Sequence, residues 1–79
     1  MVHELKKGIE EGKIFFGIKQ SLRNSNNLDK AKVSSDCRLE IIDALRKKNI
    51  EIEQMNFSKE ELSNRLELNF QCEVFGIKK

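Results

Sequence analysis

Apolar residues near the start of the chain recur at the three- and four-residue spacing of a helix. Val2, Leu5 and Ile9 fall on one face of a helix over 2–11, and the following Gly12 is a residue type that commonly ends a helix. We therefore predict an amphipathic helix over this segment.

The next segment changes character twice. Residues 13–16, KIFF, are too few and too apolar for an amphipathic helix, so they indicate a short buried strand or an extended connection. Over 17–24, Ile18 and Leu22 repeat at four residues with polar residues between them, which predicts a second helix with a polar outer face. The polar segment 25–32 has no sustained period and predicts a loop that runs into a strand.

Three further segments show the alternation of a strand to different degrees. Residues 31–36 are a weak candidate, since only Ala31 and Val33 alternate. Residues 50–55, IEIEQM, alternate strictly and predict a half-buried strand. Residues 71–77, QCEVFGI, predict a final strand.

A third helix is predicted over 37–49. Its apolar face would consist of Leu39, Ile42 and Leu45. Three consecutive basic residues near its end interact favourably with the helix dipole, and Ser35 or Asp36 is suited to cap its start.

The segment SKEEL carries the pattern of a capping box. The Ser58 hydroxyl would accept from the Glu61 amide, and the Glu61 carboxylate would reach back, while Phe57 would pack on Leu62. This pattern predicts a short helix over 59–66.

Helices and strands thus alternate in the order α-β-α-β-α-β-α-β. Strands separated by helices imply a largely parallel or mixed sheet covered by helices. The expected fold class is α/β, a three-layer α/β/α sandwich with about four strands in a mixed sheet and helices on both faces. No internal repeat or linker interrupts the 79 residues, so we expect a single domain over 1–79.

The composition disfavours an enzyme. A chain of 79 residues buries only a shallow core, and its one histidine, His3, is expected to be solvated. Cys37 and Cys72 form no CxxC pair, so we expect reduced, partly buried thiols and no metal site. No nucleophile–base pair or phosphate loop stands out, and we expect no cofactor and no small-molecule substrate.

Charge is nearly balanced along the chain. Fifteen basic and thirteen acidic residues give a formal charge of +2, so a site for a polyanion has to come from local arrangement. No apolar run approaches the ~20 residues that cross a bilayer, and the charged start is unlike a signal peptide. We expect a soluble intracellular protein that does not bind a membrane.

Candidate chemistry lies where strands and helices meet, because ligands gather at such ends of open α/β sheets. The first such connection is FFGIKQSLRN, residues 15–24, where Gly17 lets a partner approach the backbone. The polar side chains on one face of the helix that follows are Lys19, Gln20 and Arg23. Two cations suit phosphates and an amide suits a base edge. From these residues alone, a solvated amphipathic helix is the simpler explanation.

The other two connections give weaker signals. Residues 34–38, SSDCR, place a polar turn before a helix, which a cap and a solvated arginine explain. Residues 66–70, LELNF, place Leu68 and Phe70 in a loop, where exposed apolar side chains usually serve a partner. The alternative is that one or both turn into the core.

Taken in order, these segments resemble the kink-turn RNA-binding superfamily, which includes the large-subunit ribosomal proteins thirty-e and seven-Ae and small bacterial relatives. The similarity runs from Glu4 to Ile77. Its most specific part, G-K-x-x-x-G-x-K-Q-x-x-[KR], is met by Gly12, Lys13, Gly17, Lys19, Gln20 and Arg23. The Lys-Gln pair is closer to ribosomal thirty-e and the bacterial relatives than to the guide-RNA members, which typically have Asn-Glu there.

The resemblance implies a protein that binds a sharply bent RNA internal loop. Gln20 would match the position that reads a guanine edge, and the phosphates would be neutralised by Lys13, Lys19 and Arg23. The loop before the last strand would cover a base turned out of the stack, a mode of recognition common for RNA. The remaining candidate RNA contacts are Asp36, Arg38, Leu68, Asn69 and Phe70.

We therefore expect a non-catalytic RNA-binding protein, in the first place a structural component of the large ribosomal subunit in the cytoplasm. Its partners would be kinked RNA, with ribosomal RNA first, and neighbouring ribosomal proteins. One alternative is a subunit of an RNA-processing or guide-RNA ribonucleoprotein, or a free regulator that binds kink-turns. Another is a small protein–protein adaptor on the same fold, with Leu68 and Phe70 as an apolar anchor.

Overall fold

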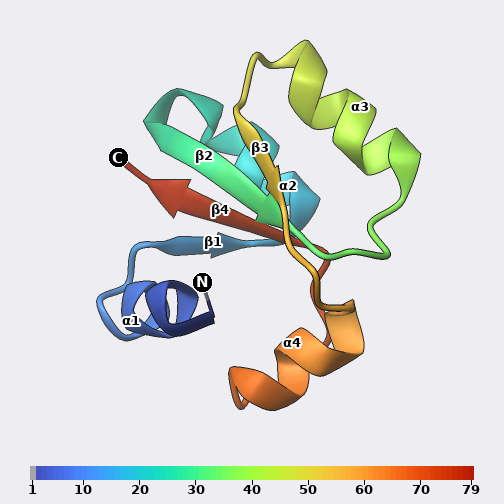
Figure 1. The fold of residues 1–79 in the computed structure, drawn as a ribbon. Coiled ribbons are helices and arrows are strands. Elements are labelled where there is room, and N and C mark those ends of the chain that lie inside the picture. Colours follow the sequence, from blue (N-terminus) through green and yellow to red (C-terminus); the bar gives the residue numbers. More distant parts are fainter. Residues whose placement is uncertain (1) are drawn as a thin grey trace.

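A four-stranded sheet lies between two pairs of helices in the computed structural model, which describes residues 2–79 (Figure 1). The helices are α1 (Val2–Glu10), α2 (Gly17–Arg23), α3 (Leu39–Lys47) and α4 (Lys59–Arg65), with a short 3-10 turn at Ser25–Asn27. The strands are β1 (Ile14–Phe16), β2 (Leu28–Val33), β3 (Ile52–Gln54) and β4 (Val74–Lys78). The predicted α/β/α class and the alternating order of elements are confirmed.

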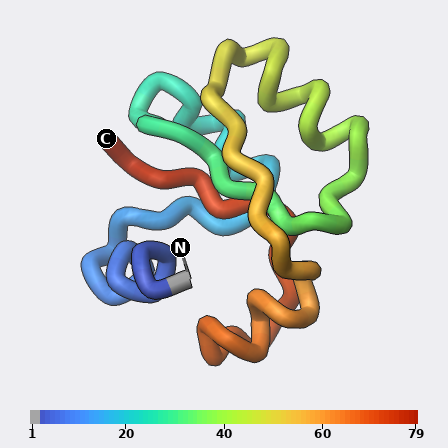
Figure 2. Tube along the Cα trace, viewed as in Figure 1, coloured from blue at the N-terminus to red at the C-terminus, as the bar shows by residue number. Residues whose placement is uncertain are grey.

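The strand order is β1-β4-β2-β3, so the last strand in the sequence lies inside the sheet. β4 pairs antiparallel with β1 and with β2, whereas β2 and β3 are parallel. Figure 2 shows this arrangement as the red C-terminal segment passing between the blue β1 and the green β2. The sheet is therefore mixed, as expected.

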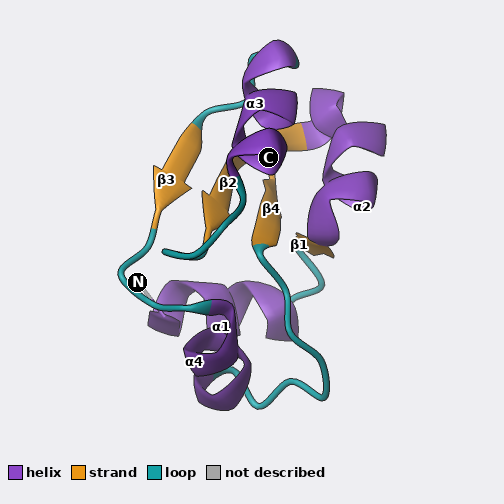
Figure 3. Cartoon of the chain, turned by 90° about the vertical axis from the view of Figure 1, so that its right-hand side faces the viewer, coloured by secondary structure: helices purple, strands orange, loops and turns teal. Residues whose placement is uncertain are grey.

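Different helices cover the two faces of the sheet, as Figures 1 and 3 show. α2 and α3 pack on one face through a cluster that includes Leu45 and Val74. α1 and α4 pack on the other face through a cluster that includes Leu62 and Phe75. Because Val74 and Phe75 are consecutive in β4, their side chains point to opposite faces, and each helix layer has its own core.

α1 and α4 follow the sequence closely. In α1, Leu5 is fully buried and Ile9 packs beside it, while the side chain of Val2 lies outside the described part of the structure. At the start of α4 the Glu61 amide donates to Ser58 Oγ at 3.2 Å, and the Ser58 amide donates to Glu61 Oε1 at 3.3 Å. The predicted capping box is confirmed.

The apolar face predicted for α3 is wrong at its first residue. Ile41, Ile42 and Leu45 are buried, whereas Leu39 is 77% exposed. At 100° per residue, Leu39 lies roughly 110° of helix rotation from the centre of that buried stripe. The predicted cap by Ser35 or Asp36 is also wrong, because Arg38 stands at the cap position and makes no side-chain cap hydrogen bond. The Asp36 carboxylate instead accepts from the Lys59 amide at the start of α4, at 3.1 Å.

The strands differ from their predicted bounds. β2 begins at Leu28 and ends at Val33, and its pairing with β4 shifts between Leu28 and Lys30. This bulge lets Leu28 and Ala31 join the same cluster although they are three residues apart. The alternation of apolar and polar residues therefore did not predict the first half of β2. β3 and β4 are also shorter at their starts than the alternating segments 50–55 and 71–77.

β2 also carries a buried cation that was not predicted from the sequence. Lys32 is 1% exposed on the face covered by α1 and α4, and its Nζ lies 3.2 Å from Glu53 and 3.7 Å from Glu4. Hydrogen bonds from Lys30 and Lys32 hold the pKa of Glu53 below its ordinary value. The ion network joins α1, β2 and β3 and satisfies a charge that burial would otherwise destabilise.

Within 2–79, no helix combines the length and the apolar character that a membrane span requires.

Candidate nucleic-acid interface

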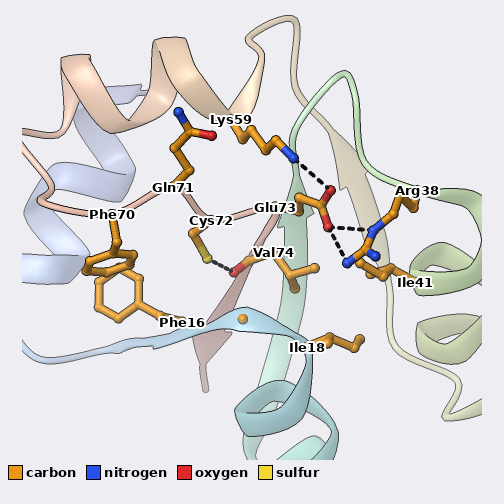
Figure 4. A pocket seen from close by; sticks show the side chains of 11 residues that line it. Phe16, Ile18, Arg38, Ile41, Lys59, Phe70, Gln71, Cys72, Glu73 and Val74 are labelled. Carbon is orange, nitrogen blue, oxygen red and sulfur yellow. Dashed lines mark hydrogen bonds and ion pairs between the residues drawn. The ribbon is translucent and has the colours of Figure 1, made fainter.

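The three connections singled out in the sequence meet at one end of the strands, around a hollow of about 390 Å³ (Figure 4). β1 and β2 both run antiparallel to β4, so the ends of β1 and β2 lie beside the start of β4. The lining residues are Phe16, Gly17, Ile18, Arg38, Ile41, Lys59, Phe70, Gln71, Cys72, Glu73 and Val74. We call this site the Phe70 hollow.

Gly17 forms the direct junction between β1 and α2. Its φ is +85°, a conformation that favours glycine, and a Cβ placed on it would meet no atom within 4 Å. Phe16 precedes it in extended conformation and caps α2 without a side-chain hydrogen bond. On either side of the sheet, Phe15 and Phe16 pack against different clusters. The packing of these two rings thus fixes the junction, while the space beside Gly17 remains unfilled.

The predicted RNA-reading side chains of α2 are solvent-exposed. Lys19, Gln20 and Arg23 are all exposed, and neither cation has a carboxylate within 4.0 Å among residues 2–79. None of the three lines the Phe70 hollow, although their helix begins there. They form a polar ridge beside it.

Arg38 reaches the hollow but is held by a carboxylate that was not predicted from the sequence. Its Nε and Nη2 atoms both donate to Glu73 Oε2 at 3.3 Å. Lys59 Nζ lies 3.6 Å from the other carboxylate oxygen, and Arg38 Nη1 lies 3.5 Å from Glu40. The side chain of Glu73 is only 11% exposed. Figure 4 shows this carboxylate between the two cations, so the hollow carries less free positive charge than its basic residues suggest.

Asp36 lies outside the hollow, on the turn that leads into α3. It is exposed, and its carboxylate ties this turn to the first amide of α4 through the Lys59 bond described above. Asp36 therefore positions the turn that carries Arg38.

The loop before β4 divides its two apolar residues between core and surface. Leu68 is half-buried and packs against the cluster under α1 and α4, and its carbonyl accepts from the Ser63 hydroxyl at 3.1 Å. Asn69 is exposed. Phe70 is 48% exposed, and its ring packs edge-on against Phe16 at 5.4 Å between centroids. Of the predicted pair of base-covering residues, only Phe70 reaches the hollow.

Lys13 does not join the other candidate residues. It precedes β1, whereas Gly17 follows it, so the two lie at opposite ends of the strand. Its Nζ is 4.0 Å from Glu11, and its carbonyl accepts from the Lys78 amide at 3.0 Å. Lys13 therefore lies beside the C-terminal end of β4, at the end of the sheet opposite the Phe70 hollow.

Two buried thiols lie close to the hollow. Burial, reinforced by the charge of Glu73, raises the pKa of Cys37 to about 11. Burial also raises the pKa of Cys72, whose thiol donates to the Val74 carbonyl at 2.9 Å. Both are free cysteines, as predicted, and remain protonated at neutral pH. In the part of the chain that the structure describes, no three His, Cys, Asp or Glu residues gather closely enough to hold a metal ion.

Neither a protein-family model nor a curated protein sequence matches the chain. Solved structures do match. A 15.5kD RNA binding protein of Giardia lamblia superposes with a TM-score of 0.77 at 19% identity, over 99% of this chain and 70% of that one. A protein of unknown function from Bacillus halodurans superposes with a TM-score of 0.81 at 14% identity, over 99% of this chain and 83% of that one. At these identities the likeness establishes a shared fold.

Proposed function

We propose that this protein is a non-catalytic RNA-binding protein that recognises a kinked internal loop. The observation that carries the proposal is the meeting of all three candidate connections at one end of the sheet. An open glycine junction, a helix with solvent-exposed cations and a half-exposed phenylalanine lie side by side there. RNA internal loops offer the matching chemistry, namely closely spaced phosphates and bases that leave the stack.

α2 is the element that would enter the RNA. Gly17 lets a groove approach the backbone, and Gln20 offers both a donor and an acceptor to a base edge. Lys19 and Arg23 flank that amide and can neutralise phosphates. The Giardia protein that shares the fold is described as RNA-binding, which supports the same class of partner for this chain.

The Phe70 hollow would take a base turned out of the stack. Phe70 offers an exposed aromatic surface for stacking. Gln71 and the paired Arg38 and Glu73 line the same space and supply donors and acceptors for the edge of that base. A base is flat and mostly apolar on its faces, which suits a hollow with aromatic and polar walls.

The particle that we propose for this protein is the large ribosomal subunit, in the cytoplasm. Support comes from the Lys-Gln pair at 19–20 and its resemblance to ribosomal thirty-e. Co-sedimentation with intact large subunits through high salt tests this assignment. If the protein instead sediments with another ribonucleoprotein fraction, the assignment changes to an RNA-processing or guide-RNA particle.

A gel-shift titration tests RNA recognition directly. The wild-type chain should bind a kink-turn at least tenfold more tightly than a straight duplex of matched length. Gln20→Ala should remove most of that preference, because the amide is assigned to a base edge. Asn64→Ala is the matched control, since it removes an exposed amide from α4. No preference for the kink-turn in the wild type would contradict the proposal and favour a protein–protein adaptor.

A further inference from the structure

A second hollow of about 480 Å³ lies at the opposite end of the strands from the Phe70 hollow. It is lined by Phe15, Asn24, Asn27, Lys78 and Lys79. The backbone places these residues together, because β4 ends beside the start of β2 and the Lys79 amide donates to the Asn27 carbonyl at 2.9 Å. We call this site the Lys78 hollow.

The charge of the Lys78 hollow is unbalanced. Among residues 2–79, no aspartate or glutamate lines it, and neither of its lysines has a carboxylate within 4.0 Å. Lys78 Nζ instead lies 5.0 Å from the centroid of the Phe15 ring. In the Phe70 hollow, by contrast, Glu73 already holds both cations. Among the residues described, the two unpaired lysines of the Lys78 hollow outweigh the partial negative charge of the α2 C-terminus that also lies there, so its side chains favour an anion more than those of the Phe70 hollow do.

α2 connects the two hollows. Gly17 starts the helix at the Phe70 hollow, and Asn24 caps its end in the Lys78 hollow. Gln20 lies between them on the same helical face, and its carbonyl accepts from Asn24 Nδ2 at 2.9 Å. Seven residues of helix span about 10 Å.

We propose that the RNA strand that contacts α2 continues past the helix end and places a phosphodiester group in the Lys78 hollow. This inference rests on the proposed function. Lys78 and Lys79 neutralise the phosphate, and the amides of Asn24 and Asn27 bond to phosphate or sugar oxygens. The partly buried Phe15 forms the apolar floor that keeps the Lys78 ammonium in place. The contact carries no base specificity and fixes the register of the RNA stem along α2.

The test compares two charge variants on kink-turns of different stem length. Lys78→Gln/Lys79→Gln removes the cations of the hollow, and Lys47→Gln/Lys48→Gln removes the same charge from the end of α3. Three RNAs are compared. The first has the shortest stems that preserve the kink, and each of the other two has one of these stems extended. Affinity is measured by fluorescence anisotropy over a salt series.

The inference predicts a loss that depends on the stem. Lys78→Gln/Lys79→Gln should lower affinity for one of the lengthened RNAs about five- to eightfold per lost phosphate contact at 0.1 M salt, with a log–log slope smaller by about 0.7 to 0.9 per contact. Binding to the shortest RNA, and binding by the α3 variant, should not change. Equal losses on all RNAs, or no loss on any, would overturn the inference while leaving the proposed function intact. Absence of kink-turn preference in the wild type would overturn both.

Discussion

Replacing Gly17 with alanine separates the binding role of this junction from its structural role. The added Cβ meets no atom within 4 Å, so packing contributes nothing to the change in stability. The cost comes from the φ of +85°, which disfavours an L-residue by about 1–2 kcal/mol. Alanine also restricts the unfolded chain, which returns about 0.4–1 kcal/mol. We expect a net loss of about 0–1.5 kcal/mol in the free energy of unfolding.

The effect of Gly17→Ala on RNA binding should be larger than its effect on folding. A methyl group at the surface that the RNA approaches forces the helix start away from the groove. We expect kink-turn affinity to fall at least tenfold, which corresponds to about 1.4 kcal/mol. Urea unfolding followed by circular dichroism gives the stability term, and fluorescence anisotropy with a labelled kink-turn gives the binding term.

Gly12→Ala provides a matched control. Gly12 has a φ of +69°, and a Cβ added there would likewise meet no atom within 4 Å, but it lies at the other end of β1. Its stability loss should fall in the same range of about 0–1.5 kcal/mol, because the same two effects set it. Its RNA affinity should match the wild type. Equal RNA affinity of the two variants would show that the RNA does not approach Gly17.

Three further outcomes are expected. Glu73→Gln should free Arg38 and Lys59 for the phosphate of the base that enters the Phe70 hollow, so affinity for kinked RNA and the steepness of its salt dependence should both rise; an unchanged salt slope would show that no phosphate lies beside these two cations. The lowered pKa of Glu53 gives a stability contribution that is present above its unfolded value near 4.5 and is lost as the pH falls through the folded value. In acid, the urea concentration at the unfolding midpoint should therefore depend less on pH in Glu53→Gln than in the wild type. An unchanged pH dependence would show that Glu53 does not contribute to the acid sensitivity of the fold. With a pKa of about 11, Cys37 should react with a thiol reagent at pH 8 far more slowly in the native chain than in urea; equal rates would show an accessible thiolate.

Periodicity predicted the order of the elements because each helix and strand has one face against a core. The capping box at Ser58 was readable since its donors and acceptors lie within one turn of sequence. Leu39 was misplaced because a three-residue spacing from Ile42 fits a helical face, yet the stripe that meets the sheet is centred on Ile41, Ile42 and Leu45. Local spacing does not tell which side of a helix the sheet occupies.

The charged residues of the site depend on contacts that sequence spacing does not reveal. Glu73 and Arg38 are 35 positions apart, and only the pairing of β2 with β4 brings them together. Lys32 is buried because Glu4 and Glu53 converge on it from two other elements. The sequence signal was modest: Glu73 and Lys32 each stand between apolar neighbours in strand-like segments. A charge at such a position indicates a buried partner without identifying it.

The central place of β4 affects how the protein can fold during synthesis. β1 and β2 both pair with β4 and not with each other, although both precede it in the chain. The four-stranded sheet therefore cannot form until residues 74–78 have left the ribosome. Until then, the apolar faces of the earlier helices and strands remain exposed. Helix formation is local and fast, whereas the joining of β1 to β2 through β4 is long-range and slow. A nascent chain that ends before Val74 should remain open to proteases and chaperones.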